Sequence, residues 1–72
     1  MINYILVSQG IKIYETNDLL EAINMRNKAN IDWREYVEEC YENWEIPADN
    51  EVFLYVEEIA EGIRDIYLFE GE

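Results

Sequence analysis

Residues 32–45 read DWREYVEECYENWE and carry the clearest periodic pattern in the chain. Apolar side chains recur there at the i, i+4, i+7, i+8, i+11 spacing of a helix that packs one face on a core. They are Trp33, Val37, Cys40, Tyr41 and Trp44. We expect this helix to start at an Asn30 or Asp32 cap and to be stopped by Pro47, since proline cannot continue a helix there.

A shorter helix is expected just before it, from Asp18 to about Lys28. Asp18 followed by Glu21 fits an aspartate variant of the capping box, which satisfies free N–H groups at a helix start. The positive charge of Lys28 suits a helix C-terminus. The apolar side chains of this helix are Leu19, Leu20 and Ile23.

Four β-rich segments flank the two helices. They cover residues 2–7, 11–15, 51–57 and 63–69. Gln9 and Gly10 form a hairpin turn between the first two, and Gly62 lies between the last two, where residues 58–61 alternatively form a helical turn. The order ββααββ predicts one α+β domain over residues 1–72: a four-stranded antiparallel sheet with two helices packed on one face.

The composition restricts the class of partner. The 72 residues include 17 Asp and Glu, five Lys and Arg and no His, which gives a net charge of −12. Half of the residues are hydrophobic, so the chain is expected to fold despite its charge. Direct binding to nucleic acid or to an anionic membrane is not expected, because both require basic surface. A basic protein partner is favoured.

The residue types needed for most catalytic sites are missing. Without His, the chain has no Ser-His or Cys-His pair, and its three separate glycines form no phosphate loop. Cys40 alone makes neither a disulfide nor a thiolate zinc site, and it is interpreted as a small core residue. The acidic pairs Glu38 and Glu39, and Glu57 and Glu58, are interpreted as solvated surface and not as an active site. We therefore expect no enzyme activity, no catalytic residues, no metal and no cofactor; the lack of a signal-peptide pattern predicts a cytoplasmic protein.

The acidic residues are segregated along the chain and around the second helix. Ten acidic residues and no basic one lie between Glu35 and Ile63. On a helix with about 100° per residue, four carboxylates fall within an arc of about 80° opposite the apolar stripe. These are Asp32, Glu35, Glu39 and Glu42. The four carboxylates span about 15 Å along the helix axis, which is one negative charge per about 5 Å. One DNA strand carries a phosphate charge per about 3.4 Å of its axis, so the two charge spacings are of the same order.

This charge row suggests a protein that imitates nucleic acid. We hypothesise that it docks, without catalysis, in the basic groove of a nucleic-acid-binding protein or nuclease. The expected contact residues are Asp32, Glu35, Tyr36, Glu38, Glu39, Glu42, Glu45, Asp49 and Glu51, with Tyr36 as an apolar anchor. The size, acidity and lack of catalytic chemistry are similar in kind to phage-encoded inhibitors of host defence, such as anti-CRISPR and anti-restriction proteins and uracil-DNA glycosylase inhibitors, which act in the host cytoplasm.

Other functions fit the same composition. An immunity or antitoxin protein that neutralises a basic nuclease toxin would also be acidic and would form a salt-sensitive complex. A general protein-interaction domain would use a sheet edge or exposed tyrosines. High net charge also keeps a protein soluble and monomeric without further function. The sequence sets neither the identity of the partner nor the number of copies in the complex.

Overall fold

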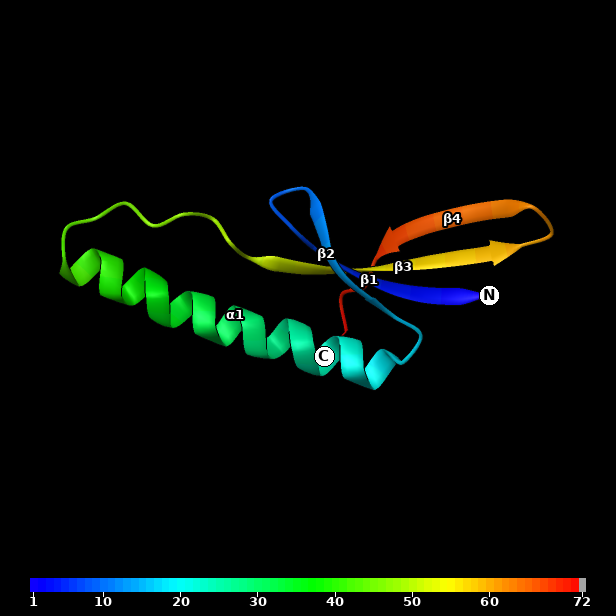
Figure 1. Ribbon diagram of the computed structural model, residues 1–72, viewed down its shortest axis with the longest axis horizontal. Helices are drawn as coiled ribbons and strands as arrows, with labels where there is room; N and C mark the ends of the chain where they lie inside the picture. Colours follow the sequence, from blue (N-terminus) through cyan, green and yellow to red (C-terminus); the bar gives the residue numbers. More distant parts are fainter. Residues whose placement is uncertain (72) are drawn as a thin grey trace.

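The computed structural model describes residues 1–71 and has one helix packed on one face of one sheet, in the order ββαββ (Figure 1). The elements are β1 (Ile2–Ser8), β2 (Ile11–Thr16), α1 (Leu19–Glu42), β3 (Val52–Ala60) and β4 (Ile63–Leu68). The predicted α+β class and four-stranded antiparallel sheet are confirmed. The predicted order ββααββ is wrong, because a single helix takes the place of two.

Helix α1 runs without a break through the region where an interruption was expected. Asp18 caps it as predicted, since its side chain accepts hydrogen bonds from the N–H groups of Leu20 (3.0 Å) and Glu21 (3.2 Å). The predicted end near Lys28 and the second cap at Asn30 or Asp32 are wrong. The 24 residues of α1 contain no proline and no glycine, so nothing in the chain favours a break. The buried and half-buried side chains also follow one uninterrupted helical periodicity, so a single straight helix keeps them all on the same side. They include Ala22, Ala29, Trp33 and Cys40.

The helix ends three residues earlier than expected and before Pro47. Asn43 is its C-cap, and Trp44 takes the left-handed conformation with φ of 59°. The N–H of Glu45 then donates to the carbonyl of Cys40 at 2.8 Å, a closure typical of helix C-termini. The backbone therefore turns away at Trp44, and proline is not what stops the helix.

The strand order is β2-β1-β3-β4, with every neighbouring pair antiparallel. β2 and β3 therefore run in the same direction on either side of β1, and α1 is the crossover between them. Both hairpins close with two-residue turns, Gln9-Gly10 and Glu61-Gly62, in which all four residues have positive φ. This is the turn geometry that matches the twist of paired strands. β3 continues to Ala60, so the alternative helical turn at residues 58–61 is not formed.

The core lies between the first half of α1 and the middle of the sheet. Leu54 and Ala22 are fully buried, and Leu6 and Val52 are nearly so. Half-buried side chains complete this cluster: Tyr4, Tyr14, Leu19, Ile23, Ala29 and Phe69. The second half of α1 extends past the sheet, and the loop that follows runs back beside it, which makes the molecule 52 Å long and only 21 by 17 Å across (Figure 1).

Asn30 joins the middle of α1 to the start of β3. Its Oδ1 accepts from the N–H of Val52 at 2.8 Å, and its Nδ2 donates to the carbonyl of Val52 at 3.0 Å. These backbone groups face the same edge of β3 as those of Leu54, whose carbonyl accepts from the N–H of Phe69. β4 ends at Leu68, so no strand of the described residues lies beside Val52 on this edge of β3. The side-chain amide of Asn30 makes the hydrogen bonds that a neighbouring strand would otherwise make there.

Replacing Asn30 by Ala should lower the free energy of unfolding by about 2 kcal/mol, because both backbone groups of Val52 lose their partner. Urea denaturation followed by circular dichroism measures this change. Asn24→Ala is the matched control, since Asn24 is exposed on the same helix. Equal stability of the two variants would contradict the assigned role of Asn30.

Candidate functional site

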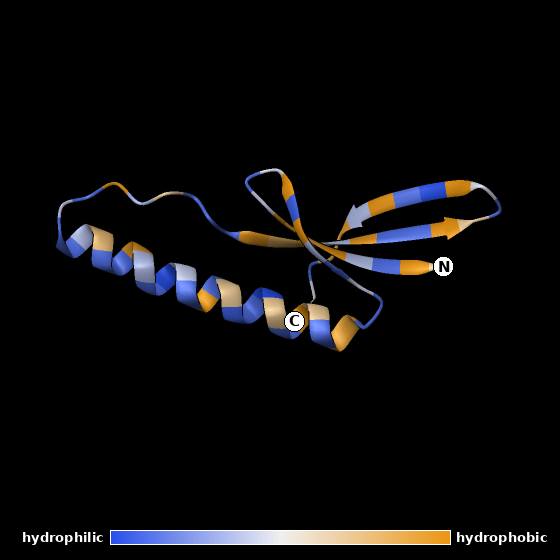
Figure 2. Ribbon diagram, in the orientation of Figure 1, coloured by the Kyte–Doolittle hydropathy of each residue, from blue (hydrophilic) through white to orange (hydrophobic). Residues whose placement is uncertain are grey.

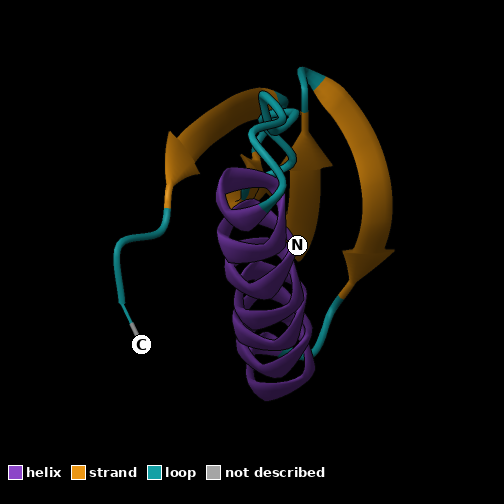
Figure 3. Cartoon of the chain, turned by 90° about the vertical axis from the view of Figure 1, so that its left-hand side faces the viewer, coloured by secondary structure: helices purple, strands orange, loops and turns teal. Residues whose placement is uncertain are grey.

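Five of the predicted contact residues share the outer side of α1. They are Asp32, Glu35, Glu38, Glu39 and Glu42, and all five are exposed. We call them the acidic ridge. Trp33, Val37 and Cys40 on the other side of the same turns are half-buried or buried. Figure 3 looks along the helix and shows the strands curving over one side of it, which leaves the other side open to solvent.

No residue of the acidic ridge forms an ion pair within the described part of the chain. Within residues 1–71 the ion pairs are Lys12–Glu15 (3.2 Å) and Glu57–Arg64 (2.7 Å), and neither includes a ridge residue. Neighbouring carboxylates about 6 Å apart in water repel by roughly 0.7 kcal/mol per pair. This repulsion is relieved when a positively charged surface approaches the ridge.

The other predicted contact residues belong to the loop side of the helix. The loop after α1 is held by Trp33, whose Nε1 donates to the carbonyl of Ala48 at 3.0 Å, and by Tyr36, whose hydroxyl accepts from the N–H of Ala48 at 3.4 Å. Tyr36 is 41% exposed at the margin of the ridge. The structure places the remaining carboxylates on this loop and not on the ridge: Glu45, Asp49 and Glu51.

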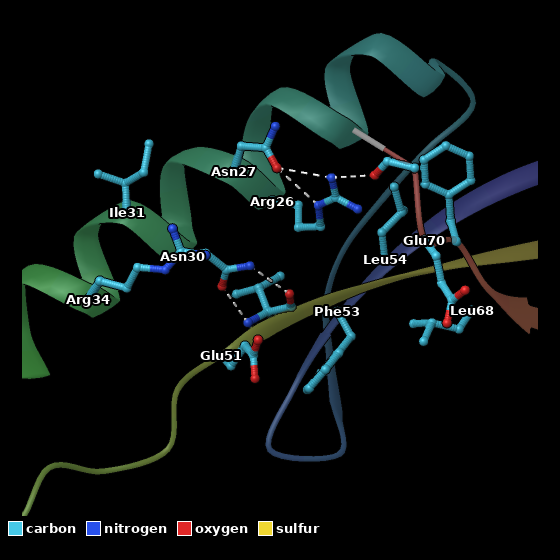
Figure 4. A pocket seen from close by; sticks show the side chains of 13 residues that line it. Arg26, Asn27, Asn30, Ile31, Arg34, Glu51, Phe53, Leu54, Leu68 and Glu70 are labelled. Carbon is cyan, nitrogen blue, oxygen red and sulfur yellow. Dashed lines mark hydrogen bonds between the residues drawn. The ribbon is translucent and has the colours of Figure 1, made fainter.

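A cleft of about 520 Å³ lies on another flank of α1, against the ends of β3 and β4 (Figure 4). Arg26 and Arg34 line it together with Glu51 and Glu70, so its charges balance. The sequence interpretation missed this cleft. The sequence feature that indicates one wall of the cleft is the i, i+4, i+8 spacing of Arg26, Asn30 and Arg34. This spacing places three polar side chains on the same flank of a helix.

A group of exposed apolar side chains lies at the end of α1 and just beyond it, and two of its three members, Tyr41 and Trp44, were predicted to be in the core. Trp44 and Ile46 are each 96% exposed, and Tyr41 is 68% exposed. We call these three residues the apolar tip. The predicted core role of Trp44 and Tyr41 is wrong because α1 extends past the sheet, so no strand covers this part of the stripe; Cys40 is buried as predicted. Trp44 also has the left-handed backbone that disfavours residues with a Cβ.

The interpretation of Glu57 as solvated surface is wrong, because Glu57 is a buried carboxylate on the sheet face that points away from α1. Its side chain accepts hydrogen bonds from Nδ2 of Asn3 (3.2 Å) and from Nε of Arg64 (2.7 Å). The hydrogen bond from Asn3, followed by that from Arg64, lowers the pKa of Glu57 below its ordinary value of 4.5. Glu57 is therefore ionised at neutral pH and acts as the acceptor of an ion pair, not as a proton donor.

Comparison with protein-family models, with curated proteins and with solved structures gives no match. In residues 1–71, no helix combines the length and the apolar composition of a membrane span. The same residues hold no cluster of three or more Asp, Glu or Cys side chains with the geometry of a metal site.

Replacing Glu57 by Gln should destabilise the protein at about pH 7 and have less effect at about pH 3. The pKa of Glu57 in the folded protein lies below its ordinary value of 4.5. The ionised Glu57 therefore contributes its full stabilisation above pH 4.5, and this contribution is lost as the pH falls through the pKa of the folded state. Urea denaturation at the two pH values measures the difference between wild type and variant. Glu39→Gln is the control, because the exposed Glu39 should show no stabilising contribution at either pH. A wild-type advantage that is the same at both pH values would contradict this assignment.

Proposed function

We propose that this protein is a non-catalytic inhibitor that occupies the basic nucleic-acid-binding groove of a target protein. The acidic ridge would take the place of the phosphates, as in the inhibitors that phages use against host defence nucleases in the host cytoplasm. The observation that supports this proposal is the row of exposed carboxylates on one helix, none of which forms an ion pair within residues 1–71. The mechanism is steric and electrostatic competition for the groove.

The continuity of α1 supports this reading, because it fixes the spacing of the charges. The half of the helix that carries the ridge extends from the body of the protein as a rod (Figure 1). An α-helix rises about 1.5 Å per residue, so the row from Asp32 to Glu42 is about 15 Å long. A rigid row needs no ordering when it binds, which lowers the entropic cost of the complex.

The same charges make the binding sensitive to salt. Complementary fields speed the encounter of an acidic and a basic surface, and this attraction is screened over about 8 Å at physiological ionic strength. A target that binds nucleic acid through phosphate contacts already has the required basic groove. The inhibitor and the nucleic acid would therefore compete for the same groove with similar salt dependence.

The apolar tip favours a second candidate, an immunity protein or a protein-interaction domain. Trp and Tyr side chains are the most frequent energetic centres of protein interfaces, and Trp44 is held in solvent next to Glu42 and Glu45. An immunity protein that binds its toxin beside the active site leaves nucleic-acid binding partly intact. A groove inhibitor is instead displaced by nucleic acid, so competition with duplex DNA distinguishes the two.

Replacing Glu35, Glu39 and Glu42 together by Lys should abolish capture of the target while the fold is kept. Each replacement adds two charge units, so the net charge changes from −12 to −12 + 6 = −6. Stability should stay equal or rise, because repulsion along the ridge is removed. The measurement is retention of a salt-eluted target, identified by mass spectrometry, on the immobilised wild-type and variant proteins.

The control variant for this experiment has the same net charge as the ridge variant but keeps all five carboxylates of the acidic ridge. It replaces Glu61, Asp65 and Glu70, all exposed and all away from the ridge, by Lys. Retention by this control and loss by the ridge variant support the proposal. Equal retention by both variants would show that the ridge only provides solubility, and retention that duplex DNA does not reduce would favour the immunity alternative.

Replacing Trp44 by Gly should stabilise the free protein by about 0.5–1 kcal/mol, because glycine adopts the left-handed conformation without a Cβ clash. If the apolar tip contacts the target, the same variant should bind at least tenfold more weakly with an unchanged salt dependence. Thermal denaturation and titration with the captured target measure the two effects. Leu20→Ala, at a 66% exposed position at the opposite end of α1, serves as the control for binding. Full affinity of the Trp44 variant would exclude the tip from the interface.

A further inference from the structure

The sheet face turned away from α1 is apolar, although no helix or strand of residues 1–71 covers it. The strand register places its residues side by side, for example Ile5 opposite Tyr55 and Tyr55 opposite Leu68. Its apolar members are Ile5, Val7, Phe53, Tyr55, Ile59, Ile66 and Leu68. We call this set the outer sheet face. Phe53 and Leu68 point away from the helix in Figure 4, and Leu54 points toward it.

This pattern departs from that of an antiparallel sheet with one solvated face. Such a sheet alternates apolar residues toward the core and polar residues toward water. β1 and β3 instead contain consecutive apolar runs, Tyr4–Val7 and Val52–Val56, which are typical of strands buried on both faces. Figure 2 shows these hydrophobic segments in the strands. The helix covers one face only, and Phe53 (39%), Ile66 (50%) and Leu68 (42%) stay exposed on the other.

The outer sheet face is also electrically neutral in a chain with a net charge of −12. The charged strand residues on it form two ion pairs, Lys12–Glu15 and Glu57–Arg64. A basic partner is attracted to the acidic ridge and not to this face, and nucleic acid or an anionic membrane requires a basic surface, which this face lacks. A neutral apolar face is best matched by another neutral apolar face, which a second copy of the chain provides.

We propose that two copies of this chain pack their outer sheet faces together around a two-fold axis. The dimer has a helix-sheet-sheet-helix arrangement, in which packed layers lie about 10 Å apart. The two acidic ridges then lie on opposite outer sides, about 30 Å apart by layer spacing, well beyond the screening length of about 8 Å. The Asn3–Glu57–Arg64 cluster enters the interface with its hydrogen bonds already made. This proposal is independent of the proposed function, because the ridge stays free.

The expected affinity follows from the size of the face. Four strands about 4.8 Å apart and about 23 Å long give a flat footprint of about 440 Å². A standard stable interface buries about 800 Å² of accessible surface on each partner. We therefore expect a dimer whose population rises across the micromolar range of chain concentration.

Sedimentation equilibrium of the purified chain from about 1 μM to 1 mM, a range that brackets weak dimers, measures this association. Ile66→Glu should raise the dissociation constant of the dimer at least tenfold, because it buries an unpaired carboxylate in the interface. Ile31→Glu should leave the dimer intact. It is a closely matched control, because Ile31 is 52% exposed on α1 and Ile66 is 50% exposed on β4.

Phe53→Gln distinguishes a dimer that packs through the outer sheet faces from one that pairs through the β4 edge strands. Phe53 lies on the central strand β3, so it contacts a second copy only in face packing. The variant should also raise the dissociation constant at least tenfold while circular dichroism shows an unchanged fold. A wild-type chain that stays monomeric at the highest concentration overturns the proposal. So does a dimer that tolerates Phe53→Gln, or one that Ile31→Glu disrupts equally.

Discussion

The pair of hydrogen bonds between Asn30 and the backbone of Val52 fixes how this small protein is arranged. It attaches the middle of α1 to the first residue of β3. Residues before Asn30 pack on the sheet, with Ala22 fully buried, while most of those after it extend past the sheet. A helix held at its middle exposes more surface than one lying flat on a sheet. The ridge, the tip and the returning loop all belong to the part beyond the attachment.

The charges of the molecule are distributed in the same way. A row of unpaired carboxylates lies along the projecting half of the helix, and further exposed carboxylates lie on β4 and the turn before it, while the arginines of the cleft are balanced by Glu51 and Glu70. On the outer sheet face every charged strand residue has an ion-pair partner. A net charge of −12 therefore does not describe a uniformly acidic surface. It describes a strongly negative side of the helix, further acidic residues in the β3–β4 hairpin, and an outer sheet face that a neutral or apolar partner can approach.

The sequence predicted the strands and the Asp18 cap correctly, because alternation and capping are local signals. It failed at Asn30, whose residue type favours helix caps but whose amide here pairs with a distant strand. It failed at Trp44 because periodicity tells which side of a helix a residue faces, not whether anything covers that side. The exposure of Glu35 and Glu39 was predictable from the same periodicity. The cleft was not, since its walls come from segments far apart in the chain.

The strand order also determines how the chain must fold. Each hairpin closes locally through a two-residue turn, and α1 forms within one continuous segment. The central pairing joins β1 to β3, with Ser8 opposite Val52 and Ile2 opposite Glu58, so it encloses the whole helix and its loop. Closing such a large loop is entropically costly and slow compared with forming hairpins and helices. We therefore expect the pairing of β1 with β3 to form later than the local hairpin and helix contacts.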